Sequence, residues 1–428
     1  MRYVIVGAGP AGVVAAETIR GRDAAGDIAL IGDEPGEPYS RMAIPYVLTG
    51  HIGEAGALLR KTKDHYRALG IRYVPGRAAK LDRARKELAL ADGTKVPFDR
   101  LLIATGAHAI KPPVPGLDLP GVHHCWTMAD ARAIAKRAGP GAEVVLVGAG
   151  FIGCIILESL VERGVRLAVV ESENRMLPKM MDEAGGDMIE RWCDAKGVKV
   201  LTATRLKGVE KGKGDRLAVA LDPGGTVPAD LVVVATGVKA NTDFLAGSDL
   251  ELEGGVRVDD RLVVRSARAS PRRADGDAIF AAGDCAQGPD FSGGFMVHAI
   301  QPTAAEHGRI AGVNMTGGDA RYKGSLIMNV LDTAGLISAS FGHWDKAEEA
   351  RAVDVQAFKY VKLAFAGDRL VGALTIGRTD HIGAIRGLIQ TRAALGSWKA
   401  KLMRDPTRVV EAFVASSCAP RAQARRMP

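Results

Sequence analysis

Two glycine-rich segments of the chain have the residue types and the spacing that bind a dinucleotide. Residues 2–21 read RYVIVGAGPAGVVAAETIRG, and residues 143–164 read EVVLVGAGFIGCIILESLVERG. Each runs from an apolar stretch through GAGxxG into an amphipathic stretch, which predicts a strand, a tight turn and a helix. In such a turn the first glycine makes the bend, the second lets a pyrophosphate approach the backbone, and the third lets helix and strand pack. These roles fall to Gly7, Gly9 and Gly12 in the first copy and to Gly148, Gly150 and Gly153 in the second.

An acidic residue follows each predicted helix at the end of the next apolar stretch. The first such stretch ends in Asp33-Glu34 and the second in Glu171. A carboxylate in this place accepts hydrogen bonds from an adenosine ribose, so we expect Glu34 and Glu171 to do so. Ser172-Glu173-Asn174 follows Glu171, without an arginine to hold a 2′-phosphate. Because a carboxylate repels that phosphate, the second site is predicted to prefer NADH over NADPH.

The two segments form an internal repeat, because each predicts the same βαβ unit. Two further stretches also echo each other, 101–106 (LLIATG) and 231–237 (LVVVATG), and each predicts a strand that closes one nucleotide-binding half. A strand at 278–284 and a helix at about 302–314 follow an irregular basic loop at 264–278. Beyond about residue 321 the pattern changes to strands at 358–365 and 370–376, then helices at 380–395 and 406–416.

These patterns predict an α/β fold with two Rossmann-type three-layer domains and a smaller C-terminal α+β domain. The first nucleotide-binding domain is expected to be discontinuous, at 1–115 and 247–320. The second is expected at 116–246, and the α+β domain at 321–428. A chain of 428 residues is long enough for this number of domains.

Composition excludes several classes of protein. The formal net charge is +8, but Lys and Arg are spread along the chain apart from the short runs at 268–273 and 421–426, so we expect no nucleic-acid binding. No apolar stretch is long enough for a membrane span. The first predicted strand starts at Arg2, which leaves no room for a signal peptide, and we expect a cytoplasmic protein. Five scattered cysteines form no CxxC pair, which argues against a disulfide framework and against a metal site.

With these motifs in order, the chain resembles the FAD-dependent pyridine nucleotide-disulfide oxidoreductases, and most closely the branch of ferredoxin, rubredoxin and NADH-dependent nitrite reductases. The carriers of the resemblance include PYSR at 38–41, AGD at 282–284 and GRIAGVN at 308–314. It implies that the first glycine motif binds FAD, that Asp284 holds the FAD ribitol, that Arg41 lies by the FAD, and that the second motif binds NAD(P)H. The expected FAD residues are Gly7, Gly9, Pro10, Ala11, Gly12, Glu34, Arg41, Thr105, Gly106, Gly283, Asp284, Thr303 and Ala304. The expected NAD residues are Gly148, Gly150, Phe151, Ile152, Gly153, Glu171, Thr236 and Gly237.

The departures from this family concern the flavin side of the pocket. Met42 stands where thiol-using relatives carry a redox cysteine, so no thiolate is expected there. Relatives in the ferredoxin reductase branch carry a Lys and a Glu beside the flavin, where this chain has Tyr46 and Ile155. Losing both members avoids the buried unpaired charge that losing one would leave. No catalytic residue is assigned, and the candidates are Tyr46, Phe151 as an aromatic gate, and His298 as a proton donor.

Five statements complete the sequence-based hypothesis. Cys154, Cys193, Cys285 and Cys418 are expected to be buried thiols, with Cys285 of most interest because it follows Asp284. The helix that starts near Thr303 and Ala304 is expected to direct its amides at the flavin. We predict an enzyme that passes electrons from NADH through FAD to an external acceptor, such as an acidic carrier of the ferredoxin or rubredoxin type. A stand-alone NADH oxidase or quinone reductase and a non-turnover flavoprotein sensor are the alternatives. A homodimer is left open.

Overall fold

The computed structural model describes residues 1–266, 278–346 and 348–418 of the chain. These residues fall into two compact units. Unit 1 consists of Met1–Ile110, Trp126–Ala131 and Val238–Ser325, and unit 2 of Lys111–Cys125, Arg132–Gly237 and Leu326–Pro428. The basic runs at 268–273 and 421–426, and most of the predicted loop at 264–278, lie outside the described residues.

Unit 1 is built on a parallel five-stranded sheet. The strand order is β19-β7-β1-β2-β3, with β1 (Arg2–Val6) between β2 (Asp27–Gly32) and β7 (Arg100–Ile103). The outer strands are β3 (Ile71–Pro75) and β19 (Ile279–Ala281). A small antiparallel sheet of β4 (Ala78–Asp82), β5 (Glu87–Leu90) and β6 (Lys95–Pro97) contributes Leu81 and Leu88 to the same core. The rest of unit 1 includes η1 (Arg41–Ala43), α2 (Ile44–Thr49), α3 (Glu54–Ala57), α4 (His65–Ala68), η2 (Asp243–Leu245), β18 (Val256–Arg257), η3 (Gly283–Cys285), β20 (Ala286–Pro289) and β21 (Phe295–Met296).

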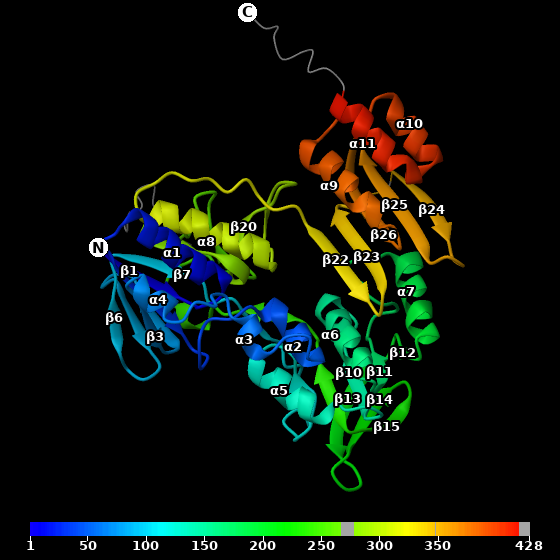
Figure 1. Ribbon diagram of the computed structural model, residues 1–428, viewed down its shortest axis with the longest axis horizontal. Helices are drawn as coiled ribbons and strands as arrows, with labels where there is room; N and C mark the ends of the chain where they lie inside the picture. The colour runs from blue at the N-terminus through cyan, green and yellow to red at the C-terminus, as the bar shows by residue number, and fades with distance from the viewer. Residues whose placement is uncertain (267–277, 347, 419–428) are drawn as a thin grey trace, which may run out of the picture. The chain divides into compact units, whose positions relative to one another are not determined.

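Helices α1 (Pro10–Arg22) and α8 (Gln301–Met315) lie side by side in unit 1 (Figure 1). Their close approach depends on glycines in α8. A Cβ at Gly308 would lie 2.2 Å from the Ala11 carbonyl oxygen, and one at Gly312 would lie 2.8 Å from Thr18 Cβ. Any larger residue at these positions would push α8 off α1, which carries the first glycine motif.

Unit 2 repeats the nucleotide-binding sheet. The order is β12-β11-β10-β16-β9, all parallel, with β10 (Glu143–Val147) between β11 (Arg166–Val170) and β16 (Leu231–Val234). The edge strands are β9 (Val122–His124) and β12 (Lys199–Leu201). Helices α6 (Phe151–Glu162) and α7 (Glu183–Ala195) follow β10 and β11, and α5 (Met128–Arg137) precedes β10. An antiparallel sheet of β13 (Arg205–Lys211), β14 (Leu217–Asp222) and β15 (Gly225–Ala229) completes this half.

The C-terminal part of unit 2 is an antiparallel five-stranded sheet with three helices. The order is β22-β23-β26-β25-β24, from β22 (Met328–Thr333), β23 (Leu336–Gly342), β24 (Glu348–Asp354), β25 (Lys359–Ala366) and β26 (Arg369–Ile376). Helices α9 (Ile382–Thr391), α10 (Ser397–Arg404) and α11 (Val409–Cys418) follow, with η4 (Thr379–His381) and η5 (Pro406–Arg408) before α9 and α11.

A buried charge cluster fastens this sheet to α7. The Lys362 ammonium lies 2.8 Å from Glu349 and 3.3 Å from Asp182, the N-cap residue of α7, and its side chain is 5% exposed. The Tyr360 hydroxyl donates to Asp182 at 2.7 Å. Arg351 also pairs with both carboxylates but is 44% exposed, so removing the ammonium would leave them without their buried cation and weaken the attachment of the sheet.

The predicted fold class is confirmed, with one correction at the C-terminus. The sequence pattern predicts a single helix at 380–395, but the structure ends α9 at Thr391 and begins a separate α10 at Ser397. Arg392 adopts a left-handed conformation with φ 51°, and Gly396 has φ 54°, so the chain turns between the two helices. The three-domain division at 115/116, 246/247 and 320/321 stays a prediction, because the compact units group the chain in another way.

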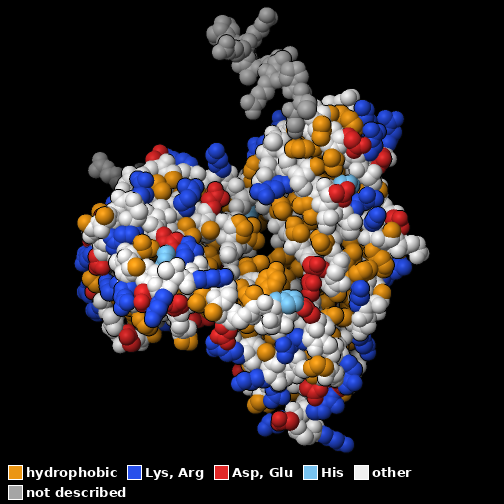
Figure 2. Space-filling view, in the orientation of Figure 1, with side chains coloured by type: hydrophobic (Ala, Val, Ile, Leu, Met, Phe, Trp, Pro, Cys, Tyr) orange, Lys and Arg blue, Asp and Glu red, His pale blue; other side chains and the backbone are white. Residues whose placement is uncertain are grey.

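Two further observations concern the surface and the membrane. Figure 2 shows Lys and Arg side chains scattered over the visible face of both units rather than gathered into one stripe. Among the described residues, no helix combines the length and the apolar character that a membrane span requires.

Candidate functional site

The first glycine loop joins β1 to α1 with an open space at its centre. Gly7 has φ 111°, and a Cβ there would lie 2.0 Å from the Ala104 carbonyl oxygen. A Cβ at Gly12 would lie 1.9 Å from the Gly7 carbonyl oxygen. Gly9 differs, because a Cβ there would meet no atom within 4 Å. Gly9 is also the N-cap of α1 without a side-chain cap, so the loop leaves room and N–H groups for a pyrophosphate.

The second glycine loop has the same geometry in unit 2. Gly148 has φ 102°, and its Cβ would lie 2.5 Å from the Ala235 carbonyl oxygen. The Cβ of a residue at Gly153 would lie 2.0 Å from the Gly148 carbonyl oxygen, whereas Gly150 again has nothing within 4 Å. Gly150 is the uncapped N-cap of α6, and Phe151 and Ile152 are its first two, partly buried residues. In each loop, therefore, the first and last glycines are required by the packing of the protein itself. The middle glycine leaves its space open to a ligand.

Asp284 is a partly buried carboxylate of η3 in unit 1. It follows Gly283, whose Cβ position would lie 3.2 Å from Ala11 of α1 and 3.5 Å from Ala304 of α8. Burial raises the pKa of Asp284 to about 6, and Arg41 opposes that shift. Within the described part of the chain, no hydrogen bond to this carboxylate is found, which fits a group that accepts one from a cofactor hydroxyl. The residues around the first loop therefore fit FAD.

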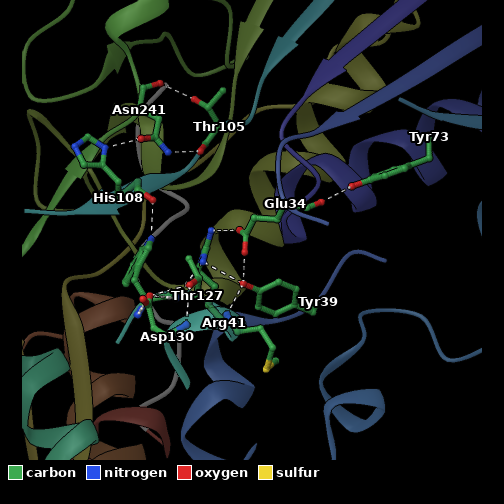
Figure 3. A network of polar contacts seen from close by, with 12 residues as sticks. Glu34, Tyr39, Arg41, Tyr73, Thr105, His108, Thr127, Asp130 and Asn241 are labelled. Atoms are coloured by element: carbon green, nitrogen blue, oxygen red, sulfur yellow. Dashed lines mark hydrogen bonds and ion pairs between the residues drawn. The ribbon is translucent and has the colours of Figure 1, made fainter. Parts of the chain in front are cut away.

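Arg41 is held by a polar network within unit 1 (Figure 3). Its guanidinium donates to Glu34 Oε1 at 2.5 Å and to the Trp126 carbonyl oxygen at 2.5 Å. The Tyr39 hydroxyl donates to Glu34 Oε2 at 2.5 Å and accepts from the Met128 amide at 3.1 Å. Arg41 thus fastens the segment Trp126–Ala131 to the β2–η1 loop, and both Glu34 oxygens are engaged by protein donors.

The two predicted ribose acids are not at equivalent positions. In unit 2, Val147 pairs with Val170, and Glu171 is the next residue along the chain. In unit 1, Val6 pairs with Ile31, so the residue equivalent to Glu171 is Gly32 and not Glu34. A Cβ at Gly32 would lie 2.4 Å from the Tyr73 hydroxyl, which leaves no space for a longer side chain. The role of Glu34 as a ribose ligand stays a prediction.

Glu171 is buried against the second glycine loop. Its Oε2 accepts from the Ala149 amide at 2.7 Å, and its Oε1 accepts from the Glu173 amide at 2.9 Å. Arg175, four residues on, donates to the carbonyl oxygens of Met181 at 3.1 Å and Pro178 at 3.1 Å. Since its guanidinium binds its own loop, Arg175 is not directed at a 2′-phosphate, and the carboxylate is the charged group beside the glycine turn.

Thr105 and Gly106 lie where the chain leaves unit 1. The Thr105 hydroxyl donates to the Asn241 carbonyl oxygen at 2.7 Å, and Asn241 Nδ2 donates to the Thr105 carbonyl oxygen at 2.8 Å. His108 Nδ1 lies 2.6 Å from Asn241 Oδ1. Strands β8 (Ala107–Ala109) and β17 (Val238–Ala240) pair at the same place. Sequence reasoning missed Asn241, although it follows the second ATG motif. Thr236 and Gly237 end that motif in unit 2, where Thr236 is exposed.

The candidate catalytic residues lie in different units. Tyr46 on α2 is 56% exposed and Met42 in η1 is 51% exposed, both in unit 1. Phe151 and Ile155 are partly buried residues of α6 in unit 2. His298 belongs to unit 1, is 7% exposed, and has its Nε2 3.1 Å from Asp290 Oδ2. His298 is therefore a buried, paired histidine, and its role as a proton donor stays a prediction.

The described cysteines are poor nucleophiles. Cys154, Cys193 and Cys285 are fully buried, and Cys125 is partly buried. Burial raises the pKa of the Cys285 thiol and of the Cys154 thiol, and it raises the pKa of Cys193 to about 12. The side chain of Cys418 lies outside the described residues.

A cavity elsewhere in unit 1 does not coincide with the predicted cofactor residues. It has a volume of about 560 Å³ and is lined by residues 36–38, 64, 66–67 and 70–73. Because it contains no residue of the glycine loop, we place the dinucleotide by the backbone geometry of that loop instead. No cluster of three metal-ligating side chains occurs among the residues that the structure describes.

Comparison with known proteins gives relatives over nearly the full length. The chain is 31% identical over 416 residues to the epsilon subunit of an NADH-dependent phenylglyoxylate dehydrogenase from Aromatoleum evansii, covering 95% of this chain and 96% of the relative. It is 35% identical over 319 residues to a probable ferredoxin reductase from Castellaniella defragrans, covering 74% and 76%.

Solved structures show the same fold. The chain matches the putidaredoxin reductase in its covalent complex with putidaredoxin with a TM-score of 0.87, at 22% identity, over 97% of this chain and 99% of that one. The family model of the pyridine nucleotide-disulphide oxidoreductases matches residues 1–305. Together with the two open glycine loops, this match means that the chain belongs to the pyridine nucleotide-disulphide oxidoreductase family.

Proposed function

We propose that this chain is a FAD-dependent NADH oxidoreductase that passes electrons to an external carrier protein. When bound, nicotinamide and flavin supply hydride and electron-transfer chemistry, and the protein supplies binding, orientation and charge. The observation that carries the proposal is the pair of open positions, Gly9 in unit 1 and Gly150 in unit 2, each at an uncapped helix start. Two such positions in one chain favour the binding of two dinucleotides, one at each loop.

The assignment of the two sites follows from the residues around each loop. Asp284, partly buried and without a hydrogen bond among the described residues, supports FAD at the first loop. The start of α8 has no side-chain cap, so the positive end of its dipole lies at Thr303, whereas the Ala304 amide donates to the Ile300 carbonyl oxygen at 3.0 Å. Glu171 beside the second loop supports NADH over NADPH, because its carboxylate would meet the 2′-phosphate.

The acceptor is inferred to be a protein rather than a thiol of this chain. Met42 replaces the redox cysteine and is exposed, and Cys285 is buried with a raised pKa, so neither supplies a thiolate. The full-length relative is a subunit of a larger NADH-dependent enzyme, and the second relative is a probable ferredoxin reductase. Both names favour an electron-carrying protein partner.

An acidic carrier suits the charge of the chain, which has 57 Lys and Arg against 49 Asp and Glu. Opposite charge raises association rates and makes them dependent on ionic strength. A cytoplasmic location is part of this proposal. A homodimer is a separate proposal, which gel filtration tests directly.

The experiment compares electron acceptors with the purified, FAD-loaded chain. NADH oxidation is measured in air, with a quinone, and with a small iron–sulfur protein, at low and at high salt. We expect slow oxidation in air and strong acceleration by the acidic carrier that weakens as salt rises. Fast turnover with oxygen or quinone alone would assign a stand-alone oxidase. FAD that binds but is not reduced by NADH would assign a non-turnover flavoprotein.

A further inference from the structure

His307 is a buried histidine that no part of the proposed reaction uses. It belongs to α8, one turn after Thr303, and it is 1% exposed. The Tyr322 ring packs edge-on against it at 4.4 Å between centroids. On another side, the Cβ position of Gly288 in β20 would lie 3.7 Å from His307 Cε1. The ring is therefore enclosed by three elements of unit 1 and has no route to water.

One ring nitrogen of His307 holds the motif that contains Asp284. The Gly283 amide donates to His307 Nδ1 at 3.3 Å. Because Nδ1 accepts, it carries no proton, and the neutral ring carries its proton on Nε2. That Nε2 is buried and has no hydrogen-bond partner among the residues that the structure describes. A buried N–H group without an acceptor costs free energy. The contact between Nδ1 and the Gly283 amide is therefore the hydrogen bond of this side chain within the described residues.

The backbone at Gly283 is expected to move if the hydrogen bond of its amide is lost. Its φ of 76° is left-handed, and its Cα lies between Ala11 of α1 and Ala304 of α8. Asp284, the next residue, is the proposed FAD ribitol ligand. The His307 ring thus contacts this turn through the Gly283 amide.

The charges around His307 keep it neutral. Burial and, to a smaller extent, the neighbouring His298 lower the pKa of His307 to about 4. His298 is itself paired with Asp290 at 3.1 Å, on the segment that follows β20. Tyr322 faces the ring from the segment after α8, and burial raises the pKa of its hydroxyl to about 12, with Glu306 and Asp290 adding to the shift. A second proton on His307 would therefore be placed in an enclosed site next to another histidine.

We propose that His307 is a positioning residue for FAD, whose neutral ring holds the Gly283 amide and thereby Asp284, and that a proton on this ring opens the Gly283–Asp284 turn and releases FAD. This inference rests on the proposed binding of FAD at the first glycine loop. It names a residue outside the glycine fingerprint as a determinant of cofactor retention.

The sign of the pH effect follows from linkage. A histidine exposed by local opening has an ordinary pKa of about 6.5, whereas the closed ring has a pKa of about 4. The closed state is therefore favoured fully above about pH 6.5, and the advantage is lost as the pH falls toward 4. Within that window the population of the open turn rises about tenfold per pH unit.

The experiment measures the rate of FAD release from the full chain between pH 8 and pH 5, by the recovery of free flavin fluorescence. In the wild type we expect a rate that rises below about pH 6.5, up to about tenfold per unit. His307→Asn places an amide oxygen near Nδ1 and cannot be protonated, so its rate should be slow and independent of pH. His307→Leu, with no acceptor, should release FAD rapidly at every pH, and circular dichroism verifies that it is folded.

Two controls separate the alternatives. His298→Asn removes the neighbouring histidine but not the contact with Gly283, so its pH dependence should persist. Asp284→Asn should weaken FAD binding at every pH while keeping the slope. The inference is wrong if His307→Asn retains the wild-type slope, or if His298→Asn or Asp284→Asn abolishes it. A wild-type chain that binds no FAD at pH 8 would instead refute the proposed function.

Discussion

Replacing Gly9 by valine should separate cofactor binding from folding. Gly9 has φ −77° and ψ −174°, a conformation that any residue adopts, and a Cβ there meets nothing within 4 Å. The substitution at this N-cap costs a few tenths to about 1 kcal/mol. The reduced freedom of the unfolded chain returns about 0.4–1 kcal/mol. The apo variant should therefore be as stable as the apo wild type to within about 1 kcal/mol.

FAD binding should respond very differently to the same change. The valine side chain occupies the space that the pyrophosphate needs, so we expect affinity to fall by at least about 100-fold. A ligand at 100 times its dissociation constant stabilises a folded protein by about 2.7 kcal/mol. In thermal unfolding scans, added FAD should raise the transition of the wild type and leave that of Gly9→Val unchanged. Fluorescence titration of the apo protein gives the affinity directly.

Two substitutions serve as controls for this experiment. Gly150→Val has the same local geometry in the second loop, so it should keep FAD and lose NADH. Gly12→Ala should fail to fold, because its Cβ would lie 1.9 Å from the Gly7 carbonyl oxygen. A Gly9→Val protein that carries one FAD per chain would refute the assignment of the first loop.

Three further predictions concern selectivity, thiols and stability. The wild type should prefer NADH over NADPH by at least about tenfold, since the repulsion between Glu171 and the 2′-phosphate costs more than about 1.4 kcal/mol. Glu171→Ser should reduce this ratio. Equal rates of flavin reduction of the wild type by the two nucleotides would refute the role of Glu171 as the ribose ligand. Reduction by NADH should give no long-wavelength thiolate-to-flavin charge-transfer band, because the buried Cys285 thiol has a raised pKa; a band that disappears in Cys285→Ser would contradict this. Lys362→Met should destabilise unit 2 by up to about 3 kcal/mol, since Asp182 and Glu349 would lose their buried cation and keep only the partly exposed Arg351; an unchanged free energy of unfolding in urea would contradict this.

The local parts of the fold could be predicted from the sequence because they depend on short-range rules. The glycine spacing alone indicates which positions allow no Cβ, and the contacts at Gly7 and Gly12 agree. The helix predicted at 302–314 is observed as Gln301–Met315. Hydrophobic periodicity and turn chemistry are sufficient for such elements.

The long-range parts could not be predicted in this way. The offset between Glu34 and Glu171 depends on strand register, which a count of residues does not give. The engagement of Arg41 with Trp126 joins residues that are 85 positions apart. The left-handed Arg392, which ends α9, has no glycine or proline signal of its own. His307 was missed because its partner is a backbone amide, which leaves no trace in the sequence.

The pairing of β8 with β17 has a consequence for the history of the chain. Ala109 and Val238 are register partners, so the chain re-enters unit 1 beside the point where it left, about 5 Å away. Neighbouring entry and exit points are what permit one domain to be inserted into another without opening the host. Residues 111–125 and 132–237 therefore have the form of an insertion into unit 1, attached at two neighbouring points of its backbone.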